Sequence, residues 1–195
     1  GAIGSNLKEH CFDKGHDVIG VARDKHISRS ADVVVHLSAY GNISSHKDIQ
    51  EIYKANLYDT IRLLENSIDN NYSLFVVTST SSVTLPIQTP YSMSKKAAEE
   101  YALWFAKEYD KPIVVVRPAT VTGVGDRSEH LIPTLIRSCL HDEKMPFVSS
   151  PCHDFVDVRD YCSAIDIIRE NIYQLRGAII TVGSGISTRN EEVLD

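Results

Sequence analysis

The chain has 195 residues, of which 43% are hydrophobic, so it can form one domain with a sizeable core, or one domain and part of a second. Its net charge of −6 and the lack of a basic patch exclude general nucleic-acid binding. No apolar run is long enough to span a bilayer.

Short apolar runs alternate along the chain with longer helical patterns. The runs rich in Val and Ile are predicted strands: Asp17–Ala22, Asp32–Leu37, Leu74–Ser79, Ile113–Arg117 and Ala178–Val182. The predicted helices are Ile3–Lys14, Lys47–Asp69, Tyr91–Tyr109, Glu129–His141 and Arg159–Tyr173. Nearly continuous hydrophobicity is typical of parallel strands buried on both faces, and the alternation predicts a doubly wound α/β sheet. Because the chain starts directly at a helix, we expect the first strand of the sheet to be missing from it.

The predicted helix Tyr91–Tyr109 is amphipathic. Its packing face is predicted to hold Ala97, Ala98, Tyr101, Ala102, Phe105 and Ala106, while Lys96, Glu99, Glu100 and Lys107 cover the other side.

The first turn of this helix carries a possible proton-transfer group. Tyr91 and Lys95 are four residues apart and share one helix face, so the ammonium can lower the pKa of the phenol. Thr80, in a hydroxyl-rich run after a predicted strand, can hold a substrate oxygen while Tyr91 exchanges its proton. This arrangement suits hydride transfer at a carbinol carbon, although an ordinary surface Tyr–Lys pair has the same spacing.

Two segments near the N-terminus point to a dinucleotide. Gly1, Ile3 and Gly4 lie in what looks like the second half of a glycine-rich loop, where small residues and helix N–H groups approach a pyrophosphate, but an ordinary helix start looks the same. Arg23 follows Ala22, which stands where an acidic residue would bind the adenosine ribose. Arg23 therefore favours NADP over NAD, unless it is simply solvated, and Asp24 could still serve the ribose.

These residues belong to a longer series of motifs. In chain order the series comprises Gly1 to Gly4 (end of GxxGxxG), Asp32 to Ala39 (DVVxHLAA), Asn56 to Thr60 (NxxGT), Thr80 with Tyr91 and Lys95, Arg117 to Gly123 (RPxNVYG), His153 to Asp160 (RDFVxVxD), and Val182 to Gly185 (NIGSG). In order and spacing the chain resembles the extended short-chain dehydrogenase/reductase family, in its nucleotide-sugar epimerase and dehydratase branch.

The resemblance implies a Rossmann-type fold and a role for each matching position. Thr80, Tyr91 and Lys95 would be catalytic, and Lys95 would also hold the nicotinamide ribose. Further cofactor contacts are implied for Leu37, Ser38, Ala39, Asn56, Pro118, Thr120 and Val121. The substrate would be a nucleotide-sugar contacted by Thr80, Thr120 and His153. Residues 1–124 would form the dinucleotide-binding domain, and 125–195 a mixed segment with substrate-binding elements and a returning strand at 178–183.

Departures from the family pattern narrow the chemistry. In the 4,6-dehydratases the catalytic Thr is followed by Asp-Glu, whereas Thr80 is followed by Ser81 and Ser82, which cannot supply carboxylate acid–base chemistry. Epimerisation or simple reduction is therefore favoured over dehydration. His153 replaces the usual Arg, which leaves open a reductase of a non-nucleotide carbonyl compound. A dinucleotide-binding sensor without catalysis is a third possibility.

The remaining expectations concern environment and assembly. Four cysteines without CxxC spacing, and no visible signal peptide, predict reduced thiols in a cytoplasmic protein. Scattered histidines predict no metal site, and His36 is interpreted as a core histidine. Family members often dimerise through the helices at 47–69 and 91–109, so a homodimer is expected, with Tyr53, Tyr58 and Trp104 either at its interface or in the core.

Overall fold

The computed structural model describes residues 1–21, 31–43, 45–144 and 151–193. Its contacts divide the chain into two compact units. The sheet unit comprises Ile19–Pro118 and Ala164–Thr181, and the terminal unit comprises Gly1–Val18, Ala119–Ser163 and Val182–Asp195. Each unit is described by itself.

The sheet unit is built on a four-stranded sheet in the order β1-β2-β3-β7. Its strands are β1 (Val33–His36), β2 (Leu74–Thr78), β3 (Ile113–Pro118) and β7 (Ile179–Val182). Strand β2 is parallel to both β1 and β3, with Val33 opposite Leu74 and Phe75 opposite Ile113. The prediction of a parallel α/β sheet is thereby confirmed for these elements.

Burial across the sheet follows strand position. All of β2 and nearly all of β3 are buried, whereas β1 is half-buried and β7 alternates between exposed and half-buried residues. The central strands are covered on both faces and can be continuously apolar, while an outer strand has a neighbour on one side only. The catalytic candidates follow the fully buried strand β2 in the chain.

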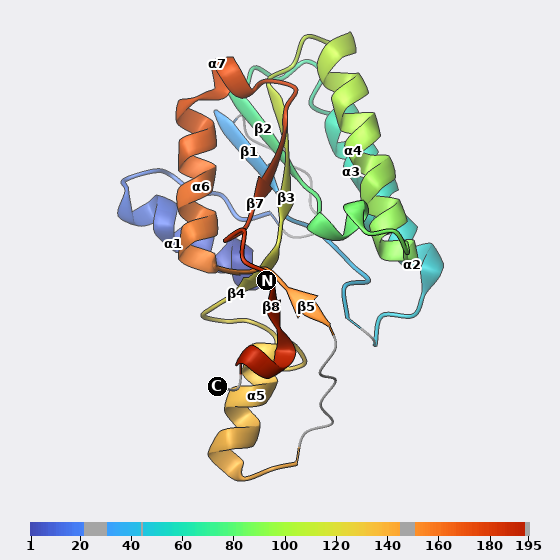
Figure 1. The fold of residues 1–195 in the computed structure, drawn as a ribbon. Helices are drawn as coiled ribbons and strands as arrows, with labels where there is room; N and C mark the ends of the chain where they lie inside the picture. The colour runs from blue at the N-terminus through green and yellow to red at the C-terminus, as the bar shows by residue number, and fades with distance from the viewer. Residues whose placement is uncertain (22–30, 44, 145–150, 194–195) are drawn as a thin grey trace. The chain divides into compact units, whose positions relative to one another are not determined.

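Helices lie on both sides of this sheet (Figure 1). Helices α2 (Ile49–Tyr53), α3 (Asp59–Glu65) and α4 (Pro90–Glu108) lie on one side, and the part of α6 (Val158–Glu170) from Ala164 onward lies on the other. A core of buried side chains joins α3 and α4 to β2 and β3: Leu64, Tyr72, Phe75, Val77, Ala102, Phe105, Ala106, Ile113 and Val115.

The amphipathic pattern of α4 is confirmed apart from one residue. Ala98, Ala102 and Phe105 are buried as predicted. Glu99 was predicted to face solvent, and this is wrong: only 2% of it is exposed. The reason is tertiary, because Arg117 on β3 meets its carboxylate.

Three predicted elements differ from the structure. Residues 17–21 of the predicted strand Asp17–Ala22 form no strand, with Ile19 and Val21 exposed, because no strand in the described part of the chain pairs with them. The predicted helix Lys47–Asp69 contains a π-helical turn at Lys54–Tyr58 and ends at Glu65. The last predicted helix is split into α6 and the short α7 (Ile172–Leu175).

The terminal unit contains α1 (Ala2–Asp13), α5 (Leu131–His141), the start of α6, and a short 3₁₀ turn at Asn190–Val193. Four very short strands form two pairs: β4 (Thr120–Thr122) is parallel to β6 (Phe155–Asp157), and β5 (Cys152–His153) is antiparallel to β8 (Thr188–Arg189). Runs of two or three residues carry no usable periodicity, so the sequence did not predict them.

Two further expectations concern the whole chain. Among the described residues, no helix combines the length and apolarity needed to cross a membrane. Cys11, Cys139, Cys152 and Cys162 form no disulfide in the part of the chain that the structure describes, and their reduced state in the cell stays a prediction.

Candidate active site

The three catalytic candidates all lie in the sheet unit, where two elements position them. Thr80 follows the end of β2, and Tyr91 and Lys95 occupy the first two turns of α4. The start of α4 is set by a capping box in which the Thr89 hydroxyl accepts from the Ser92 N–H and the Ser92 hydroxyl accepts from the Thr89 N–H. Pro90 at the first helical position reinforces this start, so the backbone around Tyr91 is held on both sides.

Thr80 lies within a small hydroxyl cluster. Its Oγ1 accepts a hydrogen bond from the Ser82 N–H at 3.2 Å and lies 3.1 Å from Ser82 Oγ. Its side chain also hydrogen-bonds Tyr91. Ser82 therefore orients the Thr80 hydroxyl, a role that the sequence analysis did not assign, although the hydroxyl-rich run was its signal.

The expected effect of Lys95 on Tyr91 is not found in this structure. Burial raises the pKa of Tyr91 to about 12, and the hydrogen bond from Thr80 only partly opposes this. The predicted lowering is therefore wrong here. The physical reason is that Lys95 Nζ donates to main-chain carbonyls, those of Thr78 at 2.8 Å and Ser38 at 3.4 Å.

Lys95 is itself strongly perturbed. Only 3% of the residue is exposed, and burial lowers its pKa to about 8, with the charge of Glu99 opposing the shift. At neutral pH it carries a positive charge held by carbonyl oxygens at the carboxyl ends of β1 and β2. That edge of a parallel sheet is where α/β folds bind ligands.

His36, at the end of β1, behaves as the predicted core histidine. Burial and, second, the charge of Lys95 lower its pKa to about 3, so the ring is neutral. Its Nε2 lies 3.0 Å from Thr60 Oγ1, and the Thr60 hydroxyl donates to the Asn56 carbonyl. Nε2 must therefore be the protonated nitrogen that donates to Thr60.

Asn56 lies fully buried in the π-helical turn. Its side-chain amide donates to the Tyr40 carbonyl and to Ser94 Oγ, and its carbonyl oxygen accepts from the Tyr40 N–H. Asn56 thus ties the segment that follows Leu37, Ser38 and Ala39 to helix α4. Contact of these residues, and of Pro118 at the end of β3, with a dinucleotide stays a prediction.

One buried polar atom without a hydrogen-bond partner lies next to Thr80 in the chain. Ser79 Oγ, adjacent to Thr80, is buried and has no hydrogen-bond partner in the described part of the structure. Buried hydroxyls are nearly always paired, so an orphan at the end of a central strand is consistent with a ligand-binding edge.

The terminal unit carries the other predicted cofactor residues. Gly1 caps α1, no atom lies within 4 Å of where a Cβ would stand, and the first helical turn contains no acidic residue. The helix N-terminus at Gly1 to Gly4 therefore fits an anionic group such as a pyrophosphate. Arg23, on which the NADP expectation rests, lies outside the described residues.

Two predicted substrate contacts come together in this unit. Thr120 on β4 and His153 on β5 approach each other, with 3.4 Å between Oγ1 and Nδ1. Burial lowers the pKa of His153, so at neutral pH it presents a neutral ring where the family pattern has a permanently charged Arg.

Asp154 organises the backbone around that pair. Its carboxylate accepts from the Ser184 N–H, the Ser184 hydroxyl and the Gly185 N–H, and its main-chain carbonyl accepts from the Thr120 N–H. A Cβ at Gly183 would stand 2.4 Å from the Asp154 carboxylate, so this approach requires glycine. Asp154 lies in the motif His153 to Asp160, but the motif did not predict this role.

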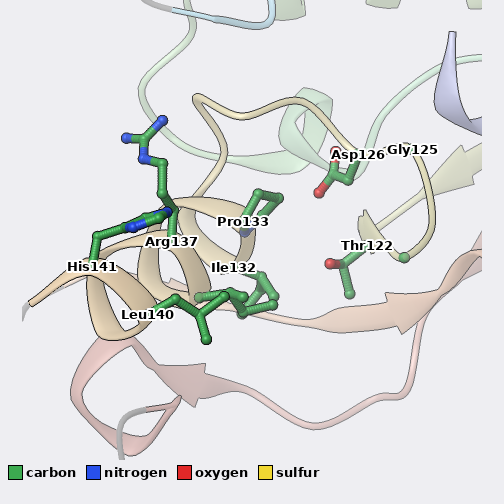
Figure 2. A pocket seen from close by; sticks show the side chains of 10 residues that line it. Thr122, Gly125, Asp126, Ile132, Pro133, Arg137, Leu140 and His141 are labelled. Atoms are coloured by element: carbon green, nitrogen blue, oxygen red, sulfur yellow. The ribbon is translucent and has the colours of Figure 1, made fainter.

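A separate cavity of about 420 Å³ lies in the region predicted to bind substrate (Figure 2). Ile132, Pro133, Arg137, Leu140 and His141 on α5 line one side, and Thr122, Gly125 and Asp126 line the other. The size is that of small-molecule pockets, and the lining combines apolar surface with a few polar groups. It does not include Thr120 or His153.

The sequence model of the NAD-dependent epimerase/dehydratase family matches residues 1–183. The chain belongs to this family. The predicted resemblance is confirmed, and so is the Rossmann-type fold.

Individual relatives in this family are distant in sequence. The chain is 27% identical to a dTDP-glucose 4,6-dehydratase of Xanthomonas campestris, over 96% of its own length and 55% of the relative's. It spans about half the length of most of the curated relatives it matches.

Two solved structures are similar in fold to this chain. One is a UDP-glucuronic acid 4-epimerase of Bacillus cereus, solved with UDP-glucuronic acid and NAD: 26% identity, TM-score 0.77, covering 83% of this chain and 57% of that one. The other is MoeE5, solved with UDP-glucose and NAD: 26% identity, TM-score 0.85, covering 98% of this chain and 76% of that one.

Proposed function

We propose that the protein is an NAD(P)-dependent nucleotide-sugar epimerase or a related oxidoreductase. The observation that carries the proposal is the grouping of Thr80, Tyr91 and Lys95 at the carboxyl edge of the sheet, with Lys95 bonded to the strand end that precedes Thr80. The solved relatives named as binding a UDP-sugar together with NAD support it.

The proposed roles follow from these contacts. Thr80 Oγ1, oriented by Ser82, holds a sugar hydroxyl oxygen, and Tyr91 Oη takes its proton and later returns it. The buried ammonium of Lys95, held by the Thr78 carbonyl, places a positive charge at the strand end that precedes Thr80. When bound, NAD(P) supplies the site that accepts the hydride and gives it back.

The residues proposed to hold NAD(P) are those at the positions that match the family's motifs. Gly1, Ile3 and Gly4 would hold the pyrophosphate, Lys95 the nicotinamide ribose, and Leu37, Ser38, Ala39, Asn56, Pro118, Thr120 and Val121 would line the remainder. We keep a preference for NADP as a proposal resting on Arg23. We likewise keep the functional division into residues 1–124 for the dinucleotide and 125–195 for substrate.

Epimerisation is favoured over dehydration by the residues after Thr80. Ser82 is the group that contacts the Thr80 hydroxyl, and neither it nor Ser81 is a carboxylate. The site thus holds hydroxyls where a water elimination needs an acid and a base. The substrate proposed is a nucleotide-sugar, contacted by Thr80, Thr120 and His153.

Two other functions remain as rivals. A reductase of a non-nucleotide carbonyl compound is favoured by the neutral ring of His153, which offers no fixed charge to a phosphate. It would change the cofactor's redox state in every turnover, whereas an epimerase leaves it unchanged. A sensor without catalysis would keep its role when Tyr91 is replaced by Phe.

Assembly and location are also proposals. Tyr58 on the π-helical turn and Trp104 on α4 are 63% and 49% exposed, which supports a homodimer through these helices. Four cysteines without CxxC spacing support the proposal of a cytoplasmic location.

The test is calorimetric titration of the full-length protein with NAD(H) and NADP(H), followed by UDP-glucose, UDP-glucuronic acid and dTDP-glucose. The expected result is tight binding of one dinucleotide and conversion of one sugar to its epimer, lost in Tyr91→Phe with dinucleotide binding retained. A folded protein that binds neither dinucleotide would overturn the proposal.

A further inference from the structure

A buried ion pair lies one helical turn beyond Lys95. Glu99 on α4 and Arg117 on β3 are joined by two parallel hydrogen bonds, Nε to Oε1 at 2.9 Å and Nη2 to Oε2 at 2.6 Å. The Glu99 side chain is 3% exposed and that of Arg117 21%. Bidentate guanidinium–carboxylate contacts fix the relative orientation of the two side chains as well as pairing their charges.

Burying this pair requires compensation. A carboxylate taken out of water is costly, and a buried pair often contributes little net stability compared with apolar residues of similar volume. Arg117 compensates Glu99, and the hydrogen bonds that Arg117 donates to the Glu99 carboxylate raise the pKa of Arg117. Stability alone therefore does not account for a carboxylate at this position of the helix, which prompts the question of what else its charge acts on.

The groups around Lys95 give an answer. His36 on β1 is neutral, Tyr91 on α4 is a neutral phenol, and the partners on β2 and after β1 are the uncharged carbonyls of Thr78 and Ser38. Arg117 on β3 donates its hydrogen bonds to the Glu99 carboxylate. Among the described residues, Glu99 is the carboxylate whose charge acts on Lys95.

We infer that the Glu99–Arg117 pair is a positioning device for Lys95: it locks the third turn of α4, one turn beyond Lys95, to β3 and keeps the Lys95 ammonium charged at the carbonyls of Thr78 and Ser38. Glu99 acts through Lys95 and touches no reacting atom. The inference rests on the proposed function for its catalytic meaning, but the charge and position of Lys95 can be measured without any activity.

The decisive variant is Glu99→Gln, which keeps the shape and removes the charge. Lysine labelled with ¹³C at Cε reports the ionisation of Lys95 by NMR, with the resonance assigned by its loss in Lys95→Met. The Lys95 midpoint is expected to fall by about one pH unit, because an opposite charge nearby favours the ammonium. Where the enzyme is active, the alkaline limb of kcat/KM should move to lower pH by the same amount.

Glu100→Gln is the matched control, because Glu100 is the exposed neighbour on the same helix and should leave the titration unchanged. If Glu99→Gln does not fold, the double variant Glu99→Gln/Arg117→Met removes both charges and should shift the Lys95 midpoint in the same direction. An unchanged Lys95 titration in a folded variant overturns the inference. If the protein proves inactive on nucleotide-sugars, the proposed function fails while the NMR result still decides this one.

Discussion

The ammonium of Lys95 donates a hydrogen bond to the main-chain carbonyl of Thr78, with 2.8 Å between Nζ and O. The bond joins the second turn of α4 to the last residue of β2, two residues before Thr80. A side chain from the helix and the strand end that carries the candidate hydroxyl are thus fixed to each other. The site depends on this junction as much as on the identities of its residues.

Replacing Lys95 by Met should remove the nearby cation and lower kcat by about 10²- to 10⁴-fold, the range associated with losing acid–base assistance. The apolar chain fills the same buried space, so the melting temperature should not fall. Steady-state kinetics and calorimetry measure the two effects. Lys96→Met, at an exposed position on the same helix, is the control and should keep its activity.

Substitutions in the hydroxyl cluster of Thr80 and Ser82 should lower kcat by different amounts. Thr80→Ala should lower kcat strongly, Thr80→Ser should retain much of it, and Ser82→Ala should cost about 3- to 10-fold, because it removes one neutral hydrogen bond of about 1 kcal/mol. Single-turnover rates would measure the series. Equal activity of Ser82→Ala and the wild type would mean that Ser82 does not orient Thr80.

Asn56 predicts a stability effect remote from the chemistry. Asn56→Ala removes three hydrogen bonds, two with the Tyr40 main chain and one with Ser94 Oγ, so the free energy of unfolding should fall by about 3 kcal/mol, at about 1 kcal/mol for each bond. Urea denaturation monitored by circular dichroism measures it. Asn66→Ala, at an exposed position after α3, should change the value by less than about 0.5 kcal/mol.

His36 predicts acid sensitivity. Its pKa is lowered from 6.5 to about 3, so the unfolded chain binds a proton that the folded chain excludes. The stabilisation is complete above pH 6.5 and is lost as pH falls towards 3, by about 1.4 kcal/mol per pH unit. His36→Gln should lose less stability than the wild type over that window. The free energy of unfolding of both proteins is measured in urea at pH 7, 5 and 4. An equal loss of this free energy in the two proteins between pH 7 and pH 4 would contradict the assignment.

Local patterns determined a large share of this fold. The strands at 33–36, 74–78 and 113–118 follow from apolar runs, and the start of α4 follows from Thr89, Pro90 and Ser92. The motif order around Thr80, Tyr91 and Lys95 identified the family. These features could be predicted because propensity, capping and strand burial are carried by residues close together in the chain.

Other features depend on which residues meet across the fold. The segment 17–21 is apolar enough for a strand but has no partner in the described structure, and Glu99 is buried because β3 brings Arg117 to it. The pKa of Tyr91 is raised because the effect of burial is larger than that of the hydrogen bond with Thr80, while the Lys95 ammonium donates to main-chain carbonyls. Charge, desolvation and pairing depend on distances through space, so only the tertiary structure could decide them.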